Sequence, residues 1–235
     1  MSKNNNVSIC GTLTEDASLS HTMHGEDFYL GYLTVPRLSG KTDTLPVMIS
    51  ERILKPEQLK KDVGIQIDGE FRTRRIKNKD EVRRYIFAQS AAIVDAFEHG
   101  KYSRNEVSIT GKINLIREPY TGDSGRVSLD IVAEVTRPGS IKTDFIPCTL
   151  WGRNATYVAE AALGDVITIE GRVQSRTQNK VRDGGYVTKR THIEVSAANV
   201  EIIESPKEKP AVQAETPEQV SQEAVSIDPH LTLRG

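Results

Sequence analysis

Basic side chains gather in one short segment of this chain. Between Arg72 and Arg84 the sequence holds seven Lys or Arg residues and two acidic ones, a local charge of +5, whereas the whole 235-residue chain has a net charge of −1. Side chains of this kind can line a path for a polyanion, because each neutralised phosphate releases condensed counterions. The basic residues of the segment are Arg72, Arg74, Arg75, Lys77, Lys79, Arg83 and Arg84.

A second segment repeats this charge pattern later in the chain. Residues 172–190 hold six basic residues against Asp183, again a local charge of +5. A single protruding hairpin is often charged for solubility alone, so one such segment would decide little. Two matching segments in a nearly neutral chain favour a nucleic-acid path. The basic residues here are Arg172, Arg176, Lys180, Arg182, Lys189 and Arg190.

Aromatic side chains are the second ingredient of such a path, because nucleobases stack on flat rings with little regard to base identity. Trp151 ends a strand-like run directly before Gly152 and Arg153, and a position capping the core is an equally good interpretation of it. Tyr157 falls in a helical pattern and is predicted to pack. The other candidates are Phe28, Tyr29, Tyr32, Tyr85, Tyr120, Phe145 and Tyr186, and of the adjacent pair Phe28 and Tyr29 one should face inward.

The elements that position these residues occur twice. The matching blocks are "NVSICGTL" (6–13) with "EVSITGKI" (106–113), "TDTLPVMI" (42–49) with "TDFIPCTL" (143–150), "VGIQIDGEFRTR" (63–74) with "DVITIEGRVQSR" (165–176), and "SAAIV" (90–94) with "SAANV" (196–200). Four blocks in the same order predict two copies of one small domain. We expect the first domain at 1–97, a linker at 98–105, the second domain at 106–204 and a disordered, proline-containing tail at 205–235.

The period of the apolar residues indicates the fold of each copy. In the second copy three strand patterns, one helical pattern and two strand patterns follow one another, at residues 106–115, 126–135, 143–152, 153–164, 165–176 and 189–202. The first copy has the same order, with a helical piece at 50–62 that Pro56 starts or kinks. The chain is therefore predicted to be all-β, with two tandem five-stranded OB-fold Greek-key barrels and one short helix per domain. A generic β-sandwich or SH3-like barrel leaves the helices unexplained.

Both copies resemble the bacterial single-stranded DNA-binding protein family and its relative, the primosomal protein PriB. Their first strands "NNVSICGTL" and "NEVSITGKI" are similar to the family pattern N-x-V-x-L-x-G-x-L, and "TEDASLSHT" is close to the family segment that follows. "FIPCTLWGR" resembles W-x-x-V-x-L-F-G-K, while "IQIDGEFRTR" and "ITIEGRVQSR" resemble V-x-I-E-G-x-L-R-T-R. The resemblance spans all but the linker and the tail.

The resemblance implies a protein that coats single-stranded DNA during replication, recombination or repair, with little sequence preference. Phe145 and Trp151 fall at stacking positions of the family, whereas the first copy has Thr44 and Ser50 there, so its stacking platform is expected to be depleted. In an OB-fold the loop between the fourth and fifth strands lies beside the binding face, and both basic segments occupy that loop. The predicted DNA-binding residues are Arg72, Arg74, Arg75, Lys77, Arg83, Arg84, Tyr85, Phe145, Trp151, Arg153, Arg172, Arg176, Lys180, Arg182, Tyr186, Lys189 and Arg190.

Family members typically form tetramers, so a homodimer of this chain would also present four OB domains. They also end in an acidic tip that recruits replication and repair proteins, and this chain has Arg234 in its place. An alternative function is a primosome-like protein-interaction module of a replication or conjugation complex, with nucleic-acid binding secondary. RNA is not separated from DNA by charge and stacking, because only contacts to the 2′-hydroxyl distinguish them.

An enzyme is disfavoured, because no nucleophile–base pair, phosphate-binding Gly-rich loop, CxxC or HExxH pattern occurs. No metal and no cofactor is therefore expected. No apolar run is long enough to span a membrane and the N-terminus has no signal-peptide pattern. Cys10 and Cys148 lie in strand-like runs and are interpreted as small buried hydrophobes. Because two such cysteines form no disulfide framework and the chain shows no signal peptide, we expect it in the cytoplasm.

Overall fold

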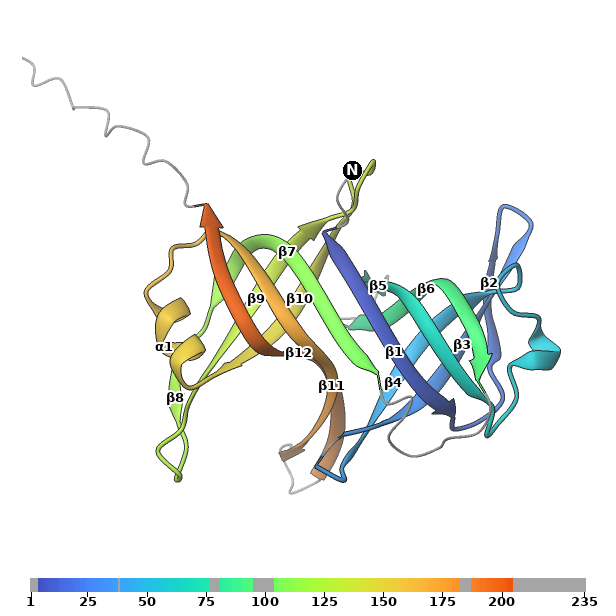
Figure 1. Cartoon of the computed structure of the whole chain (residues 1–235), viewed down its shortest axis with the longest axis horizontal. Coiled ribbons are helices and arrows are strands. Elements are labelled where there is room, and N and C mark those ends of the chain that lie inside the picture. Colours follow the sequence, from blue (N-terminus) through green and yellow to red (C-terminus); the bar gives the residue numbers. More distant parts are fainter. Residues whose placement is uncertain (1–3, 38, 77–80, 95–103, 182–186, 205–235) are drawn as a thin grey trace, which may run out of the picture.

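The computed structural model describes residues 4–37, 39–76, 81–94, 104–181 and 187–204, and for residues 178–190 it describes no side chains. Strands dominate these residues and form two closed barrels that share one twelve-stranded sheet (Figure 1). The first barrel, at residues 4–94, contains β1 (Asn5–Leu13), β2 (Ser18–Met23), β3 (Glu26–Pro36), β4 (Thr42–Ser50), β5 (Gly64–Arg75) and β6 (Val82–Val94). The second, at residues 104–204, contains β7 (Asn105–Ile116), β8 (Tyr120–Thr121), β9 (Val127–Thr136), β10 (Thr143–Trp151), α1 (Arg153–Ala159), β11 (Val166–Val181) and β12 (Val187–Glu204).

The predicted pair of OB-fold barrels is confirmed. In each barrel the first strand pairs with both the second long strand and the fourth, as β1 does with β3 and β5, and as β7 does with β9 and β11. The last strand then pairs in parallel with the third, as β6 does with β4 and β12 with β10. The short strands β2 and β8 are additional arms that pair on β3 and β9.

Along each strand apolar residues alternate with polar ones, so the apolar side chains point inward and form the barrel core. In β5, for example, Ile65, Ile67 and Phe71 are fully buried, while Asp68 between them is exposed. Gly69 of β5 and Gly171 of β11 sit at register shifts where the strands bend. A Cβ atom at Gly171 would lie 2.1 Å from the carbonyl oxygen of Ser196, so only glycine fits this close approach.

The helix predicted at residues 50–62 is wrong in extent. The structure has only a 3-10 helix, η1 (Pro56–Gln58), preceded by a hydrogen-bonded turn from Ser50 to Leu54. Pro56 lacks the amide hydrogen that would continue a helix through it, and Leu54 and Leu59 anchor the segment to the core on either side. The corresponding piece of the second barrel is a true helix, α1, which buries Ala155 and Val158.

Strands β1 and β7 join the two barrels edge to edge (Figure 1). They run antiparallel with Val7 opposite Val107, Asn5 opposite Ile109 and Ile9 opposite Asn105. Since Val7 and Val107 are matching positions of the repeat, the two barrels are related by an approximate two-fold axis between these valines. Asn5 uses its amide to bond both the N–H and the C=O of Phe71, and Asn105 bonds Val173 in the same way.

Two buried carboxylates brace the barrels at a second place. Asp43 of β4 has no exposed surface. It accepts a hydrogen bond from the Ser175 N–H of β11 at 2.6 Å and forms an ion pair with Arg37. Asp144 of β10, equally buried, accepts from the Thr73 N–H of β5 at 2.6 Å and pairs with Arg137. Each barrel therefore holds a backbone N–H on the other's fourth long strand, which fixes their relative orientation.

One block of the sequence repeat is displaced in the structure. Gly69 lies opposite Ala88 and Gly171 lies opposite Ala197, so Phe87 and Ser196, one residue earlier, are matching positions. The match of "SAAIV" with "SAANV" is therefore wrong by three residues. The error arises because the segment between Gly171 and Ser196 is longer than the segment between Gly69 and Phe87. A similarity of five residues does not reveal this difference in length.

Candidate functional site

A groove runs over the outer face of the second barrel, with a cavity volume of about 790 Å³. Its floor consists of β11 and β12, where Ser196, Ala197 and Ala198 leave room above the sheet, and Trp151 stands at the end of β10. Five basic side chains line it: Arg37, Lys41, Arg126, Arg172 and Arg176. A groove with this charge and one large ring suits an elongated anion that carries flat groups.

The pleat of β11 explains why these side chains share one face. Val173 is fully buried in the core, so Arg172, Gln174 and Arg176 point to the outside of the barrel. In β10 the same alternation buries Leu150 and leaves Trp151 half-buried on the outer face, opposite Ser128 of β9. The predicted residues Trp151, Arg172 and Arg176 are thus brought together from two different strands.

Two of the groove's cations come from the first barrel. Arg37 and Lys41 flank the turn between β3 and β4, where the Arg37 N–H donates to the carbonyl of Lys41. The hydrogen bonds to Asp43 raise the pKa of Arg37, so its guanidinium stays charged, and the same carboxylate ties it to Ser175 in the groove. The contacts of Asp43 with Arg37 and Ser175 therefore both join the barrels and complete the groove.

Trp151 lines the groove with a cation beside its ring. The guanidinium of Arg126 lies over the indole ring, 5.0 Å from its centroid, which places a positive charge beside the ring. Arg126 stands immediately before β9, at the edge of the groove. A nucleobase stacked on the indole would have its phosphate within reach of this cation.

Arg176 is partly neutralised within the protein. It pairs with Glu194 at 3.2 Å and approaches Asp130 at 3.5 Å, and the buried Gln174 donates to Glu194. Glu194 is only 4% exposed, so it fixes Arg176 rather than competing for it from solvent. Among the described residues, Lys41, Arg126 and Arg172 are the groove cations for which the structure shows no ion pair with a carboxylate.

The outer face of the first barrel is built differently. His21 of β2 stacks on Phe28 with ring centroids 5.1 Å apart, Phe28 stacks on Phe87 at 6.0 Å, and the Arg72 guanidinium lies 4.0 Å from the Phe87 centroid. We call this set of four side chains the stack. Of the adjacent pair, Tyr29 packs against the core, as one of the two was predicted to do, and Phe28 lies outside it within the stack.

The remaining predicted residues are more dispersed. In the first barrel Arg74 and Arg75 are exposed on β5 and Arg83 on β6, next to the half-buried Arg84 and Tyr85. Phe145 is 45% exposed, and its N–H donates to the hydroxyl of Thr73, so this ring of the second barrel lies beside β5 of the first. Arg153 is exposed at the start of α1.

Some predictions lie outside what the structure describes, and one is wrong. Lys77, Arg182 and Tyr186 fall outside the described residues, and so does the predicted tail. Lys180, Lys189 and Arg190 lie in the β11–β12 hairpin, for which only the backbone is described. Tyr157 does not pack, as its position in a helix suggested, but is 50% exposed, because α1 is short and turns only Ala155 and Val158 toward the core.

Four side chains of these two faces were missed by sequence reasoning: Arg37, Lys41, Arg126 and Phe87. Arg37 carries a signal that could have found it, because the Thr-Asp block extends upstream to an arginine in both copies, Arg37 and Arg137. Phe87 had no such signal, since its match in the second barrel is Ser196. Within the described residues no group of three or more His, Cys, Asp or Glu side chains could hold a metal ion, and no helix is long and apolar enough to cross a membrane.

Comparisons with known proteins bear on this geometry. The model of the single-strand binding protein family matches residues 104–203, which is the second barrel. No curated protein sequence matches the chain. Among solved structures, the single-stranded DNA binding protein from Thermus aquaticus aligns with 88% of this chain and 96% of its own, with 17% identity and a TM-score of 0.67.

A deletion variant of the same Thermus aquaticus protein aligns with 89% of this chain and all of its own, with 20% identity and a TM-score of 0.64. At these identities the likeness shows the fold of two barrels. The N-terminal domain of the PriB protein from Thermoanaerobacter tencongensis is 32% identical over 39% of this chain and 98% of its own, with a TM-score of 0.36.

Proposed function

We propose that the protein binds single-stranded DNA with little sequence preference, from the premise that the model of the single-strand binding protein family matches its second barrel. On this proposal the barrel is a binding domain and not an enzyme. The observation that carries the proposal is the groove in which Trp151 is surrounded by cations from both barrels. Phosphate attraction and base stacking are the two forces that hold unpaired strands without reading their sequence.

Each groove residue has a distinct task in this proposal. Lys41, Arg126 and Arg172 neutralise successive phosphates, while a base stacks on Trp151, whose π-face accepts any base. Arg176, held by Glu194, shapes the floor more than it contacts the strand. Because Lys41 belongs to the first barrel, a strand in the groove is already in contact with both barrels.

The strand continues from this groove toward the first barrel. Phe145 and the exposed Arg74, Arg75 and Arg83 lie on that side of the molecule and are proposed to bind the next stretch of DNA. The cationic hairpins that include Lys77, Lys180, Arg182, Lys189 and Arg190 are proposed to clasp the strand from outside, as the sequence predicts.

Fluorescence titration tests the function directly, because Trp151 is the single tryptophan of the chain. Addition of poly-dT should quench it, and the affinity should fall steeply as salt increases. Trp151→Phe, monitored with a labelled oligonucleotide, should weaken binding while the salt dependence remains. Absence of quenching together with salt-independent binding would remove the proposal, and parallel titrations with duplex DNA and RNA of equal length decide which nucleic acid is preferred.

In the cell, such a protein would coat strands exposed during replication, recombination or repair in the cytoplasm, and could meet replication or repair proteins there. Weak sequence preference suits this task, because the exposed strand has arbitrary sequence. Survival of a deletion strain after DNA damage, compared with its growth without damage, tests the repair role.

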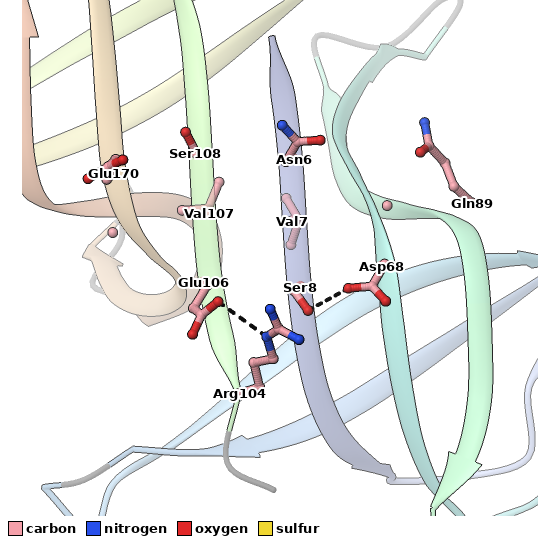
Figure 2. Close-up of a pocket in the computed structure, with 12 residues that line it drawn as sticks. Asn6, Val7, Ser8, Asp68, Gln89, Arg104, Glu106, Val107, Ser108 and Glu170 are labelled. Carbon is pink, nitrogen blue, oxygen red and sulfur yellow. Dashed lines mark hydrogen bonds and ion pairs between the residues drawn. The ribbon is translucent and has the colours of Figure 1, made fainter. Parts of the chain in front are cut away.

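We further propose a homodimer, which would bring four barrels together. The face of the sheet around the approximate two-fold axis is a shallow cavity of about 480 Å³ at the junction of β5, β1, β7 and β11. Its groups are polar: Figure 2 shows the Ser8 hydroxyl bonded to Asp68 and Arg104 paired with Glu106. A second copy docking by the same face would make a closed, symmetric interface.

The oligomeric state is measurable by light scattering against the chain mass of 26.1 kDa. A mass twice this value is expected, and Ser8→Arg combined with Ser108→Arg should return the protein to the single-chain mass by placing like charges at the axis. Thr22→Arg, on the exposed edge strand β2, is the matched control and should leave the dimer intact. A single-chain mass for the unaltered protein would refute the homodimer.

A protein-interaction module is the second candidate function, and the first barrel is the part that favours it. There Arg72 pairs with Glu70 at 2.8 Å and lies over the Phe87 ring. Its charge is therefore less available to a phosphate than the charges of the groove cations on the second barrel. Deleting this barrel would expose the edge of β7, so substitution is the cleaner test. If Arg74→Ala, Arg75→Ala and Arg83→Ala together leave DNA affinity unchanged, the first barrel serves assembly.

A further inference from the structure

Each barrel carries an aromatic ring on its outer face near the contact between its third and last long strands, but the two rings come from different strands. In the second barrel the ring is Trp151 of β10, and Ser196 of the neighbouring strand β12 pairs with Thr149, two residues before it. In the first barrel the position that matches Trp151 is Ser50 on β4, and the position that matches Ser196 is Phe87 on β6, which pairs with Met48. The expectation that the stacking platform of the first barrel is depleted did not take Phe87 into account, which provides a ring where Ser50 provides none.

The side chains around Phe87 and Trp151 differ, and they determine how easily a nucleobase could reach each ring. The sheet order is β3-β4-β6-β5, so Phe28 of β3 approaches Phe87 from one side and Arg72 of β5 from the other. In the second barrel the residues that match Phe28 and Arg72 are Ser128 and Gln174, which cannot stack. Each ring therefore has a guanidinium beside it, Arg72 at 4.0 Å from the Phe87 centroid and Arg126 at 5.0 Å from the Trp151 centroid. Glu70 holds Arg72 in place, whereas within the described residues Arg126 has no ion pair with a carboxylate.

The group that covers Phe87 resembles a nucleobase in shape. A guanidinium is planar, delocalised and stacks on aromatic faces, which an ammonium group does not do. Arg72 lies 4.0 Å from the ring centroid, and Glu70 holds it there through two hydrogen bonds, from Nε at 3.0 Å and from Nη2 at 2.8 Å. Its side chain is 22% exposed, so it forms the outermost layer of the stack and can leave without unfolding the barrel.

We propose that Phe87 is a nucleobase-stacking site of the first barrel and that Arg72 is its resident occupant in the free protein. A base of a single strand takes the place of the guanidinium on Phe87, and the released Arg72 becomes available to a phosphate. The proposal rests on the single-strand-binding function proposed above and adds to it a second base site, absent from the sequence prediction. Because its occupant must first be displaced, this site has a lower apparent affinity than the one on Trp151.

The first experiment compares Arg72→Ala with Arg74→Ala in the full chain. Both variants lose one positive charge from the same face of β5, but only the first uncovers Phe87. Affinity for a labelled dT oligonucleotide long enough to span both barrels should be roughly two- to thirty-fold higher for Arg72→Ala than for Arg74→Ala, the range expected for removing a cation–π contact. Adding Phe87→Ala to Arg72→Ala should abolish the difference.

A second measurement reports the site itself. The double variant Trp151→Phe and Phe87→Trp moves the single tryptophan into the first barrel, and saturating dT should quench it. Introducing Arg72→Ala into this chain should shift the quench to lower DNA concentration. Circular dichroism and urea unfolding of each variant establish that the barrels remain folded.

The outcomes separate this site from the function on which it rests. If Arg72→Ala weakens binding as much as Arg74→Ala does, or if the indole that Phe87→Trp introduces is not quenched at saturation, Arg72 is an ordinary phosphate contact and the Phe87 site is refuted. Quenching of Trp151 in the unaltered chain would still support single-strand binding in that case. If Trp151 itself is not quenched and no oligonucleotide binds, the function and the site are refuted together.

Discussion

Replacing Asp43 by alanine tests whether the two barrels are held as one body. The Asp43 carboxylate has no exposed surface and receives hydrogen bonds from Arg37 Nε at 2.6 Å and from the Ser175 N–H at 2.6 Å. Its removal leaves Arg37, whose side chain is 20% exposed, without its counter-charge and leaves the part-buried Ser175 N–H without an acceptor. Breaking a buried pair in this way costs about 3–5 kcal/mol, so we expect the free energy of unfolding in urea to fall by about this amount.

Two controls make this experiment specific. Asp16→Ala breaks the exposed ion pair with Lys60 within the first barrel and should leave the urea midpoint nearly unchanged. Asp43→Asn keeps an acceptor for Ser175 but removes the charge facing Arg37, and should give an intermediate loss. Hydrogen exchange at the Ser175 amide should accelerate in Asp43→Ala before the rest of β11 exchanges. A loss below about 1 kcal/mol, the range of surface pairs, would refute the reasoning that this carboxylate braces the barrels.

Three further predictions follow from single contacts. Lys41→Ala should weaken single-stranded DNA binding and lower the slope of log affinity against log salt by about 0.7, whereas Lys60→Ala, outside the groove, should not; equal slopes would exclude Lys41 from the phosphate path. Gly171→Ala should lower the free energy of unfolding by about 1–3 kcal/mol, because its Cβ would meet the Ser196 carbonyl at 2.1 Å, while Gly122→Ala, whose Cβ meets nothing nearer than 3.8 Å, should be tolerated. Burial raises the pKa of the Cys148 thiol, so iodoacetamide at mildly alkaline pH should label it only as the protein unfolds in urea; rapid labelling of the native protein would contradict its burial.

The location of the groove illustrates how far the sequence carries the candidate site. Arg172, Arg176 and Trp151 were predicted because charge density and ring chemistry are visible in the chain itself. Lys41 was not, because nothing in the sequence says that the β3–β4 turn of one barrel lies over β11 of the other. That proximity depends on the hydrogen bond between Asp43 and Ser175, which are 132 residues apart. The repeated arginine marks Arg37, but the sequence does not say that it reaches the groove.

Arg72 shows the opposite case, in which a residue type suggested one role and its neighbours indicate another. In the sequence it is one of seven basic residues in a charged segment. In the fold it pairs with Glu70 on its own strand and covers Phe87 on the next, so its charge is largely used within the protein. Cross-strand neighbours on a sheet face come from register, and register depends on bulges such as the one at Gly69.

By itself the sequence determined the fold class. Period-two apolar residues and two matching sets of blocks specify paired OB-fold barrels, because both can be recognised from the order of residues along the chain. Only the tertiary structure decided that the barrels share an edge at Val7 and Val107, that the groove on one is completed by the other, and that a carboxylate holds Arg72 against Phe87. These features arise between strands that are distant in sequence, where packing and register, and not local pattern, set which side chains meet.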